Sequence, residues 1–153
     1  MQKTREIFMT SAELYDLLVS DVQKFNDWRV KNADMRIDFD NYDFGEKTLT
    51  DAILVNMSLR NAHFVGTNIE YTTFCHSDAT GANFEKAIAG GAHFGNIENS
   101  DARLPQAFLA HLSHAAILNG ANFTESDLEM ANFRNCPKQN ACFEGANTEA
   151  VVW

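Results

Sequence analysis

Proline, cysteine and long apolar runs are scarce in this chain of 153 residues, which has only 2 prolines and 3 cysteines. No run of about 20 apolar residues exists, so the sequence predicts no membrane-spanning helix. The first residues lack both a continuous apolar stretch and a small-residue cleavage site, as a chain without a secretory signal would. We therefore expect a single structural domain located in the cytoplasm, with no membrane partner.

The three cysteines are too few and too irregularly spaced for a disulfide scaffold or for a zinc site with C-x-x-C spacing. Cys136 falls at a small inward position of the pattern described below, whereas Cys75 and Cys142 fall at outward positions. We expect three free thiols.

Motifs for chemistry are also lacking, because the chain has no nucleotide-binding loop, no G-x-S-x-G and no H-E-x-x-H. His111 and His114 have the spacing of a metal pair but no third ligand nearby in sequence. Cys75 and His76 would need His93 or another group to complete a site. We expect solvated or hydrogen-bonded histidines, with no catalytic residue, no cofactor and no metal.

Basic residues are also few, because the chain has 12 of them against 21 acidic residues, which gives a net charge of −9. The first 33 residues hold five of each, so the surplus lies on the rest of the chain. An acidic surface repels nucleic-acid backbones and favours basic partners. No direct nucleic-acid binding is expected.

What the chain does have is a period of five, running from Phe44 to Leu104. A second series of mostly small residues, such as Ala62 and Ala82, lies two positions earlier in each unit. A helix repeats its buried face near 3.6 residues and a strand at 2, so this segment is a repeat array. The first series is Phe44, Leu49, Leu54, Leu59, Phe64, Ile69, Phe74, Ala79, Phe84, Ala89, Phe94, Asn99 and Leu104.

The period returns near the C-terminus after a register slip. From Leu104 to Phe123 is 19 residues, one short of four repeats, and the slip falls within 105–118, where two alternative registers compete. At four units per turn, the large residues of one face form a ladder at strand spacing of about 4.8 Å. That face carries Phe44, Phe64, Phe84, Leu104, Phe123 and Phe143, and the predicted core also includes Phe74, Phe94 and Phe133.

The recurring unit, seen as Ala82-Asn83-Phe84, Ala121-Asn122-Phe123 and Ala131-Asn132-Phe133, resembles the pentapeptide-repeat family over roughly residues 37–150. The resemblance implies an all-β solenoid, a right-handed quadrilateral β-helix with four repeats per coil. The stretch Phe25–Arg29 resembles the tryptophan-arginine helix that precedes the repeats in some family members.

We predict three segments: an N-terminal α-helical cap over 1–34, the β-helix over 35–150 and a tail over 151–153. Ser11 is the expected N-cap of the first helix, and a second helix is expected to begin at Asp21 and to bury Phe25 and Trp28. The opposite end has two alternatives. Either Trp153 folds over the last coil and the protein is a monomer, or two copies bury Val151, Val152 and Trp153 together as a homodimer.

One column of the array is weak, because Asn99 and Lys138 occupy positions expected to be inward. A buried Lys138 without a partner would cost several kcal/mol. We expect Ile97 to fill space near Asn99 and Lys138 to turn outward. An imperfect repeat is the simpler explanation, and a site at these two residues is the alternative.

Two outward features suggest a binding surface. Acidic residues gather at the corner between the first two faces, and apolar residues occupy outward positions at Ile53, Val55 and Val65. Ile88 and Phe108 would stack in one outward column. The candidate partner surface comprises Glu46, Asp51, Glu85, Ile88, Phe108, Glu125, Asp127, Glu129, Glu144 and Glu149.

A non-enzymatic scaffold that binds a protein partner fits these observations. The family resemblance adds an alternative, a DNA mimic that binds a type II topoisomerase such as gyrase and confers quinolone resistance. The absence of long loops and of a C-terminal dimerisation helix departs from that subgroup. A third alternative, an enzyme or metal protein, would require a bound metal or a pocket near Cys75, His76 and His93.

Overall fold

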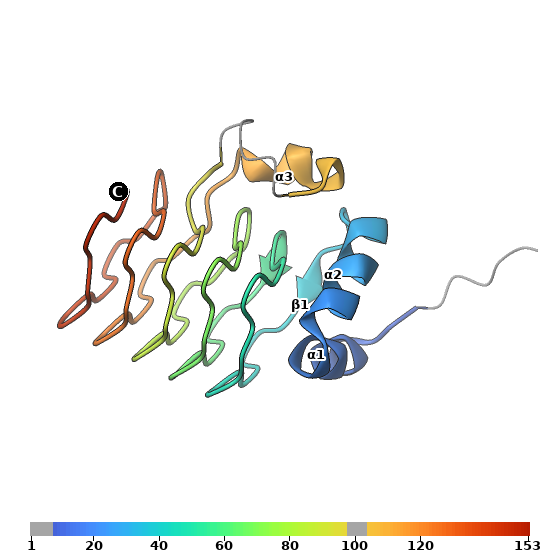
Figure 1. Cartoon of the computed structure of the whole chain (residues 1–153), viewed down its shortest axis with the longest axis horizontal. Helices are drawn as coiled ribbons and strands as arrows, with labels where there is room; N and C mark the ends of the chain where they lie inside the picture. The colour runs from blue at the N-terminus through green and yellow to red at the C-terminus, as the bar shows by residue number, and fades with distance from the viewer. Residues whose placement is uncertain (1–7, 98–103) are drawn as a thin grey trace, which may run out of the picture.

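The chain folds as a stack of square coils with two helices at the N-terminal end, as Figure 1 shows. A computed structural model describes residues 8–97 and 104–153. Its helices are α1 (Ser11–Ser20), α2 (Val22–Lys31), the 3₁₀ helix η1 (Gln106–Phe108) and α3 (Leu109–Leu112), and its strands are β1 (Ile37–Asp38) and β2 (Met57–Ser58).

Parallel pairing between coils sets the register. β1 pairs with β2 so that Ile37 faces Met57, and isolated bridges such as Asp43 with His63 keep the same offset of twenty residues. We therefore number the coils as coil 1 (37–56), coil 2 (57–76), coil 3 (77–96), coil 4 (116–135) and coil 5 (136–153).

The chain changes direction at the four corners of a coil through residues in the left-handed backbone conformation. In coil 1 the corner residues are Asn41, Glu46, Asp51 and Asn56, with φ between 58° and 64° at every one of these positions. Glycine occupies the equivalent position at Gly66, Gly81, Gly91, Gly120 and Gly145. Asparagine and glycine adopt this conformation at least cost, so the fifth residue of each unit encodes the corner.

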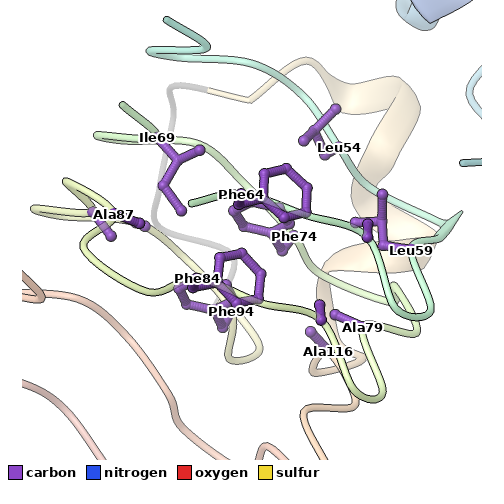
Figure 2. Close-up of a cluster of buried hydrophobic side chains, with 14 of the residues drawn as sticks. Leu54, Leu59, Phe64, Ile69, Phe74, Ala79, Phe84, Ala87, Phe94 and Ala116 are labelled. Carbon is purple, nitrogen blue, oxygen red and sulfur yellow. The ribbon is translucent and has the colours of Figure 1, made fainter. Parts of the chain in front are cut away.

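The interior holds two columns of aromatic rings that face each other, part of which is drawn in Figure 2. Phe64 and Phe84 stack with ring centroids 4.8 Å apart, and Phe74 stacks on Phe94 at 4.7 Å. Rings of opposite columns meet edge to face, as Phe84 and Phe94 do at 5.5 Å. The first column is Phe44, Phe64, Phe84, Phe123 and Phe143, and the second is Phe74, Phe94, Phe133 and Trp153.

The predicted place of Leu104 in the first column is wrong. Phe84 stacks directly on Phe123 at 4.7 Å with an interplanar angle of 2°, and Asp78 bridges Ile117 at an offset of 39 residues. Ile97 and residues 104–115, which we call the inserted segment, therefore lie outside the stack, and coil 4 resumes in register at Ala116. The apparent slip is an insertion: nineteen additional residues separate coil 3 from coil 4, and because this number is one less than the twenty of a full coil, the period seems to shift by one residue. Asn99 lies outside the described residues.

The inserted segment leaves the stack because its apolar residues pack on a different surface. Phe108 is fully buried and Leu112 is 4% exposed, both in a separate cluster beside the coils, and Leu104 packs against that cluster half-buried. This side cluster comprises Ala33, Ile53, Val55, Cys75, Ile97, Phe108 and Leu112.

The N-terminal helices pack against coil 1. Leu14, Leu18 and Phe25 belong to the main core, and Trp28 packs against it half-buried. The Asn26 amide donates to the Asp51 carbonyl and accepts from the Ile53 N–H, at 3.0 and 2.9 Å. Thr10, not Ser11, is the N-cap of α1, because its hydroxyl oxygen accepts from the Glu13 N–H. Asp21 caps α2 in the same way.

At the other end, Trp153 continues the second aromatic column. Its ring stacks on Phe133 at 5.5 Å and meets Phe143 edge-on at 5.3 Å, while 54% of the residue stays exposed. The Lys138 ammonium lies 6.0 Å from the centroid of the Trp153 ring, and Lys138 is only half-buried. Trp153 thus packs on the preceding coil, and the homodimer stays a prediction.

Candidate functional site

The predicted acidic residues lie at two successive corners, on either side of the face that carries Leu49, Ile69 and Leu128. Hydrogen bonds between coils define the columns, since the Glu46 N–H donates to Val65, and the Glu125 N–H donates to Glu144. The first corner therefore carries Glu46, Glu85, Glu125 and Glu144. We call this face with its two corners the acidic side.

The second corner of the acidic side is built in the same way. The Asp51 N–H donates to the Glu70 carbonyl, and the Met130 N–H donates to Glu149. Asp51, Glu70, Glu129 and Glu149 lie there, and Glu70 is one that the sequence analysis did not single out. Asp127 lies on the face between the corners, where its carboxylate accepts from the Asn147 amide at 3.0 Å.

The acidic side is solvated and almost free of positive charge in its last two coils. Glu125, Glu129, Glu144 and Glu149 are all exposed. Lys86 lies in the corner column next to Glu125, and its ammonium is 3.7 Å from that carboxylate, with both side chains well exposed. An exposed pair at this distance contributes little to stability. Ile88, with 43% exposed, lies on the same face beside Asp127.

Phe108 is not part of this surface, which corrects the prediction that it stacks outward with Ile88. It is 0% exposed, in the side cluster. Ile53 and Val55, also expected to point to water, are 6% and 0% exposed in the same cluster. Cys75 was expected outward and is 0% exposed too. The reason is shared: the inserted segment and α2 cover this corner of coils 1 and 2. Cys136 is buried and Cys142 exposed, as predicted.

Arg29 holds the side cluster together from α2. Its guanidinium is fully buried and donates to the carbonyls of Asn32, Met35 and Val55 at 2.8, 3.0 and 2.7 Å. Burial lowers the pKa of Arg29 to about 10, with Asp34 acting in the opposite direction. The guanidinium therefore stays charged at neutral pH and links α2 to coil 1 through the Val55 carbonyl.

A cavity of about 390 Å³ lies where α2, the coils and the inserted segment meet. Its polar wall includes Asp27 from α2 and Asp51 from coil 1, and the lining residues among 8–97 and 104–153 include no lysine or arginine. Tyr71, with 52% exposed, supplies an aromatic wall. The remaining lining residues are Gln23, Asn26, Val30, Ile53, Thr73, His93, Leu104 and Pro105.

Three histidines meet on the far side of the side cluster. His76 Nδ1 lies 3.0 Å from His111 Nδ1, and the rings of His76 and His114 stack with centroids 4.4 Å apart. The pKa of His76 is lowered, chiefly by burial and then by the proximity of His114, His111 and Arg36. Among residues 8–97 and 104–153, no group of three or more histidine, cysteine or carboxylate side chains has an arrangement that could hold a metal ion.

Comparison with known proteins identifies the repeat. The sequence model described as pentapeptide repeats matches residues 48–78 and 100–136, with eight copies of the repeat. Together with the square coils, this match shows that the chain contains pentapeptide repeats, and the family built from such repeats has the right-handed β-helix as its fold. No curated protein matches the chain.

Solved structures include similar proteins. A pentapeptide repeat protein from the thylakoid lumen of Arabidopsis thaliana is 25% identical with a TM-score of 0.58, over 72% of this chain and 63% of that one. The chain thus spans less than two thirds of the length of that protein. Rfr23 from the cyanobacterium Cyanothece 51142 is 18% identical over 86% of this chain and 99% of that one, with a TM-score of 0.43. QnrB1, a plasmid-mediated fluoroquinolone resistance protein, is 16% identical over 75% of this chain and 78% of that one, with a TM-score of 0.28.

The helices of the described residues include none that is both long and apolar enough to cross a membrane.

Proposed function

We propose that this chain is a non-enzymatic scaffold that binds a protein partner through the acidic side. The observation that supports this most directly is the exposed group of Glu125, Glu129, Glu144 and Glu149 on two adjacent coils. Two corner columns hold them at fixed spacing on a rigid stack, so the surface is preorganised and loses little conformational entropy on binding.

A convex rod with a filled core is suited to binding and poorly suited to catalysis. The interior positions are occupied by stacked rings, so the coils themselves enclose no water-poor pocket in which carboxylate pKa values would shift. The acidic side instead presents many carboxylates to solvent. We infer a partner with a basic surface, because complementary charge accelerates encounter and fixes orientation. A cytoplasmic location stays a prediction.

Affinity capture from a lysate of the source organism tests this proposal. The variant replaces Glu125, Glu129, Glu144 and Glu149 by Gln, and the matched control replaces the same four residues by Asp. We expect at least one protein to be captured by the wild type and by the Asp control but not by the Gln variant. Proteins captured equally by all three forms would contradict binding through the acidic side.

The DNA-mimic function is the second candidate. The acidic columns run along the rod, from Glu46 in coil 1 to Glu144 in coil 5, as a charged duplex backbone would. On this proposal the partner is a type II topoisomerase such as gyrase. A supercoiling assay with and without a quinolone distinguishes the candidates, since a mimic inhibits or protects gyrase at micromolar concentration. Absence of both effects would leave only the general scaffold.

A further inference from the structure

The three histidines join two parts of the molecule that are distant in sequence. His76 is the last residue of coil 2, whereas His111 lies in α3 and His114 follows α3. Besides the ring contacts, the His76 N–H donates to the His114 carbonyl at 2.8 Å. The histidine cluster is therefore a polar contact that attaches the inserted segment to the coils. It adds to the apolar contact that Phe108 makes in the side cluster.

The ring hydrogen bonds have a fixed direction. His111 Nε2 lies 2.9 Å from Asp34 Oδ1, and because a carboxylate only accepts, this nitrogen carries a proton. In neutral His111 the other nitrogen, Nδ1, is then an acceptor, so the proton between the two rings belongs to His76 Nδ1. The chain of donors runs from His76 through His111 to Asp34.

Additional protons disturb this chain in two stages. The first is accommodated, because His76 can shift its own proton to Nε2 and accept at Nδ1 from a protonated His111. The second leaves two N–H groups facing each other at 3.0 Å. His114 stacks on His76, and Arg36 adds a positive charge, so any further protonation meets repulsion from cations on both sides.

We propose that His76 and His111, with His114 stacked on His76, form an acid-sensitive latch that holds the inserted segment on the coils until both facing rings are protonated, and then releases it. The separated rings can each take up a proton, whereas the docked pair accommodates only one, so docking weakens as the second proton binds at lower pH. The pKa of His76 is depressed in the docked state, which means that its contribution is present above its ordinary value of 6.5 and is lost as pH falls below it. In the part of the chain that the structure describes, the charged groups that face the cluster are Asp34 and Arg36.

Release would uncover specific groups. Phe108 and Leu112 cover Cys75, whose thiol donates to the Gly95 carbonyl at 3.2 Å. The Ile97 N–H would lose its bond to the Leu112 carbonyl, now 2.8 Å. Leu104 and Pro105 would withdraw from the cavity beside Asp51, opening it. The latch thus goes beyond the proposed scaffold function and does not depend on the identity of the partner.

Labelling of Cys75 in the full chain tests the latch. The reagent is 4,4′-dithiodipyridine, which reacts with thiols at mildly acidic pH. Its rate is divided by that for the urea-unfolded chain at the same pH, which removes the effect of thiol ionisation. We expect this ratio for Cys75 to rise about fivefold between pH 7.0 and 5.5, while the ratio for Cys136, in the main core, changes less than twofold. An unchanged labelling ratio for Cys75, or an equal rise in the ratios of Cys75 and Cys136, would overturn the proposal.

A variant assigns the response to the histidines. His76→Asn with His114→Gln removes two titrating rings, and asparagine tolerates the left-handed backbone at position 76, where φ is 60°. We expect the ratio to change less than threefold over the same pH range, and an unaltered wild-type response in this variant would contradict the latch. Should the variant be open already at pH 7.0, the wild-type histidine ring resonances decide. If the histidine rings titrate with the same pH midpoint as the exposure of Cys75, the latch is supported. If the two midpoints differ, the latch is contradicted.

Discussion

The guanidinium carbon of Arg29 lies 5.7 Å from the centroid of the Phe108 ring, although α2 and the inserted segment are far apart in the sequence. This contact places a buried cation over an aromatic face and connects three parts of the molecule: the helix, coil 1 and the inserted segment. Several predictions about stability depend on it.

Phe108→Ala should release the inserted segment without unfolding the coils. A buried Phe→Ala change in a core costs about 3–5 kcal/mol. Here the loss in free energy of global unfolding should be smaller, because the segment can detach while Phe84 still stacks on Phe123. Urea unfolding measures the global effect and thiol labelling of Cys75 the local one. A loss of about 3–5 kcal/mol in the free energy of global unfolding, with Cys75 still protected from labelling, would contradict the view that the inserted segment can detach from intact coils.

Arg29→Met should destabilise the fold by about 3 kcal/mol or more, because hydrogen bonds from a charged donor are worth about 1.5–3 kcal/mol each and the carbonyls of Asn32 and Val55 lose theirs. Arg29→Lys keeps the charge but not the planar fork, so we expect an intermediate loss. Urea denaturation of both variants gives the comparison. Equal stability of the wild type and Arg29→Met would show that the buried guanidinium is dispensable.

Phe84→Ala should lower the free energy of unfolding by about 3–5 kcal/mol. The ring is fully buried and contacts four others: Phe64, Phe74, Phe94 and Phe123. Phe143→Ala is the matched control, since this ring is half-buried in the last coil and should cost clearly less. Thermal and urea unfolding would both report the difference, and similar losses at the two positions would argue against a continuous ladder.

The corner position gives a prediction in two directions. Met130 has φ of 61° and is 65% exposed, so Met130→Gly should relieve a left-handed backbone that costs about 1–2 kcal/mol, with a net gain of up to about 1 kcal/mol after chain entropy. Gly91→Ala in the same column should destabilise, because its Cβ would lie 2.6 Å from the Tyr71 ring. Opposite shifts in melting temperature are expected, and shifts of the same sign would refute the role of this position.

The cavity between α2 and the coils should bind a basic side chain. Asp27 and Asp51 supply negative charge, and Tyr71 supplies an aromatic wall. N-acetylarginine amide should bind weakly and shift the NMR resonances of Ile53 and Thr73. Asp27→Asn combined with Asp51→Asn should weaken binding about tenfold. Asp16→Asn, at an exposed position of α1, should leave the affinity unchanged. Shifts that persist in the double variant would place the ligand elsewhere.

Much of the β-helix was predictable because its period is local. Phe44, Phe64 and Phe84 repeat every twenty residues, and each coil buries the same two side chains per unit, so a pattern in the sequence maps directly onto the columns. The corner signal was present as well, in the asparagines and glycines of the fifth position, although only the structure showed that these residues have left-handed backbone.

The inserted segment was not predictable from the same pattern. Leu104 falls on the period by coincidence, and nothing local distinguishes a residue that packs inside a coil from one that packs beside it. The burial of Phe108, Val55 and Cys75 depends on contacts between segments that are distant in sequence. The spacing of nineteen residues between Leu104 and Phe123, one short of four repeats, was the available signal.

The most direct test of the account is whether Phe84 and Phe123 are neighbours, because the columns of acidic residues and the place of the inserted segment both follow from that register. Aromatic NOE measurements on selectively labelled protein report this contact. The structure predicts strong cross-peaks between the two rings, whose centroids lie 4.7 Å apart. Cross-peaks from Phe84 to the methyl groups of Leu104 instead would contradict it.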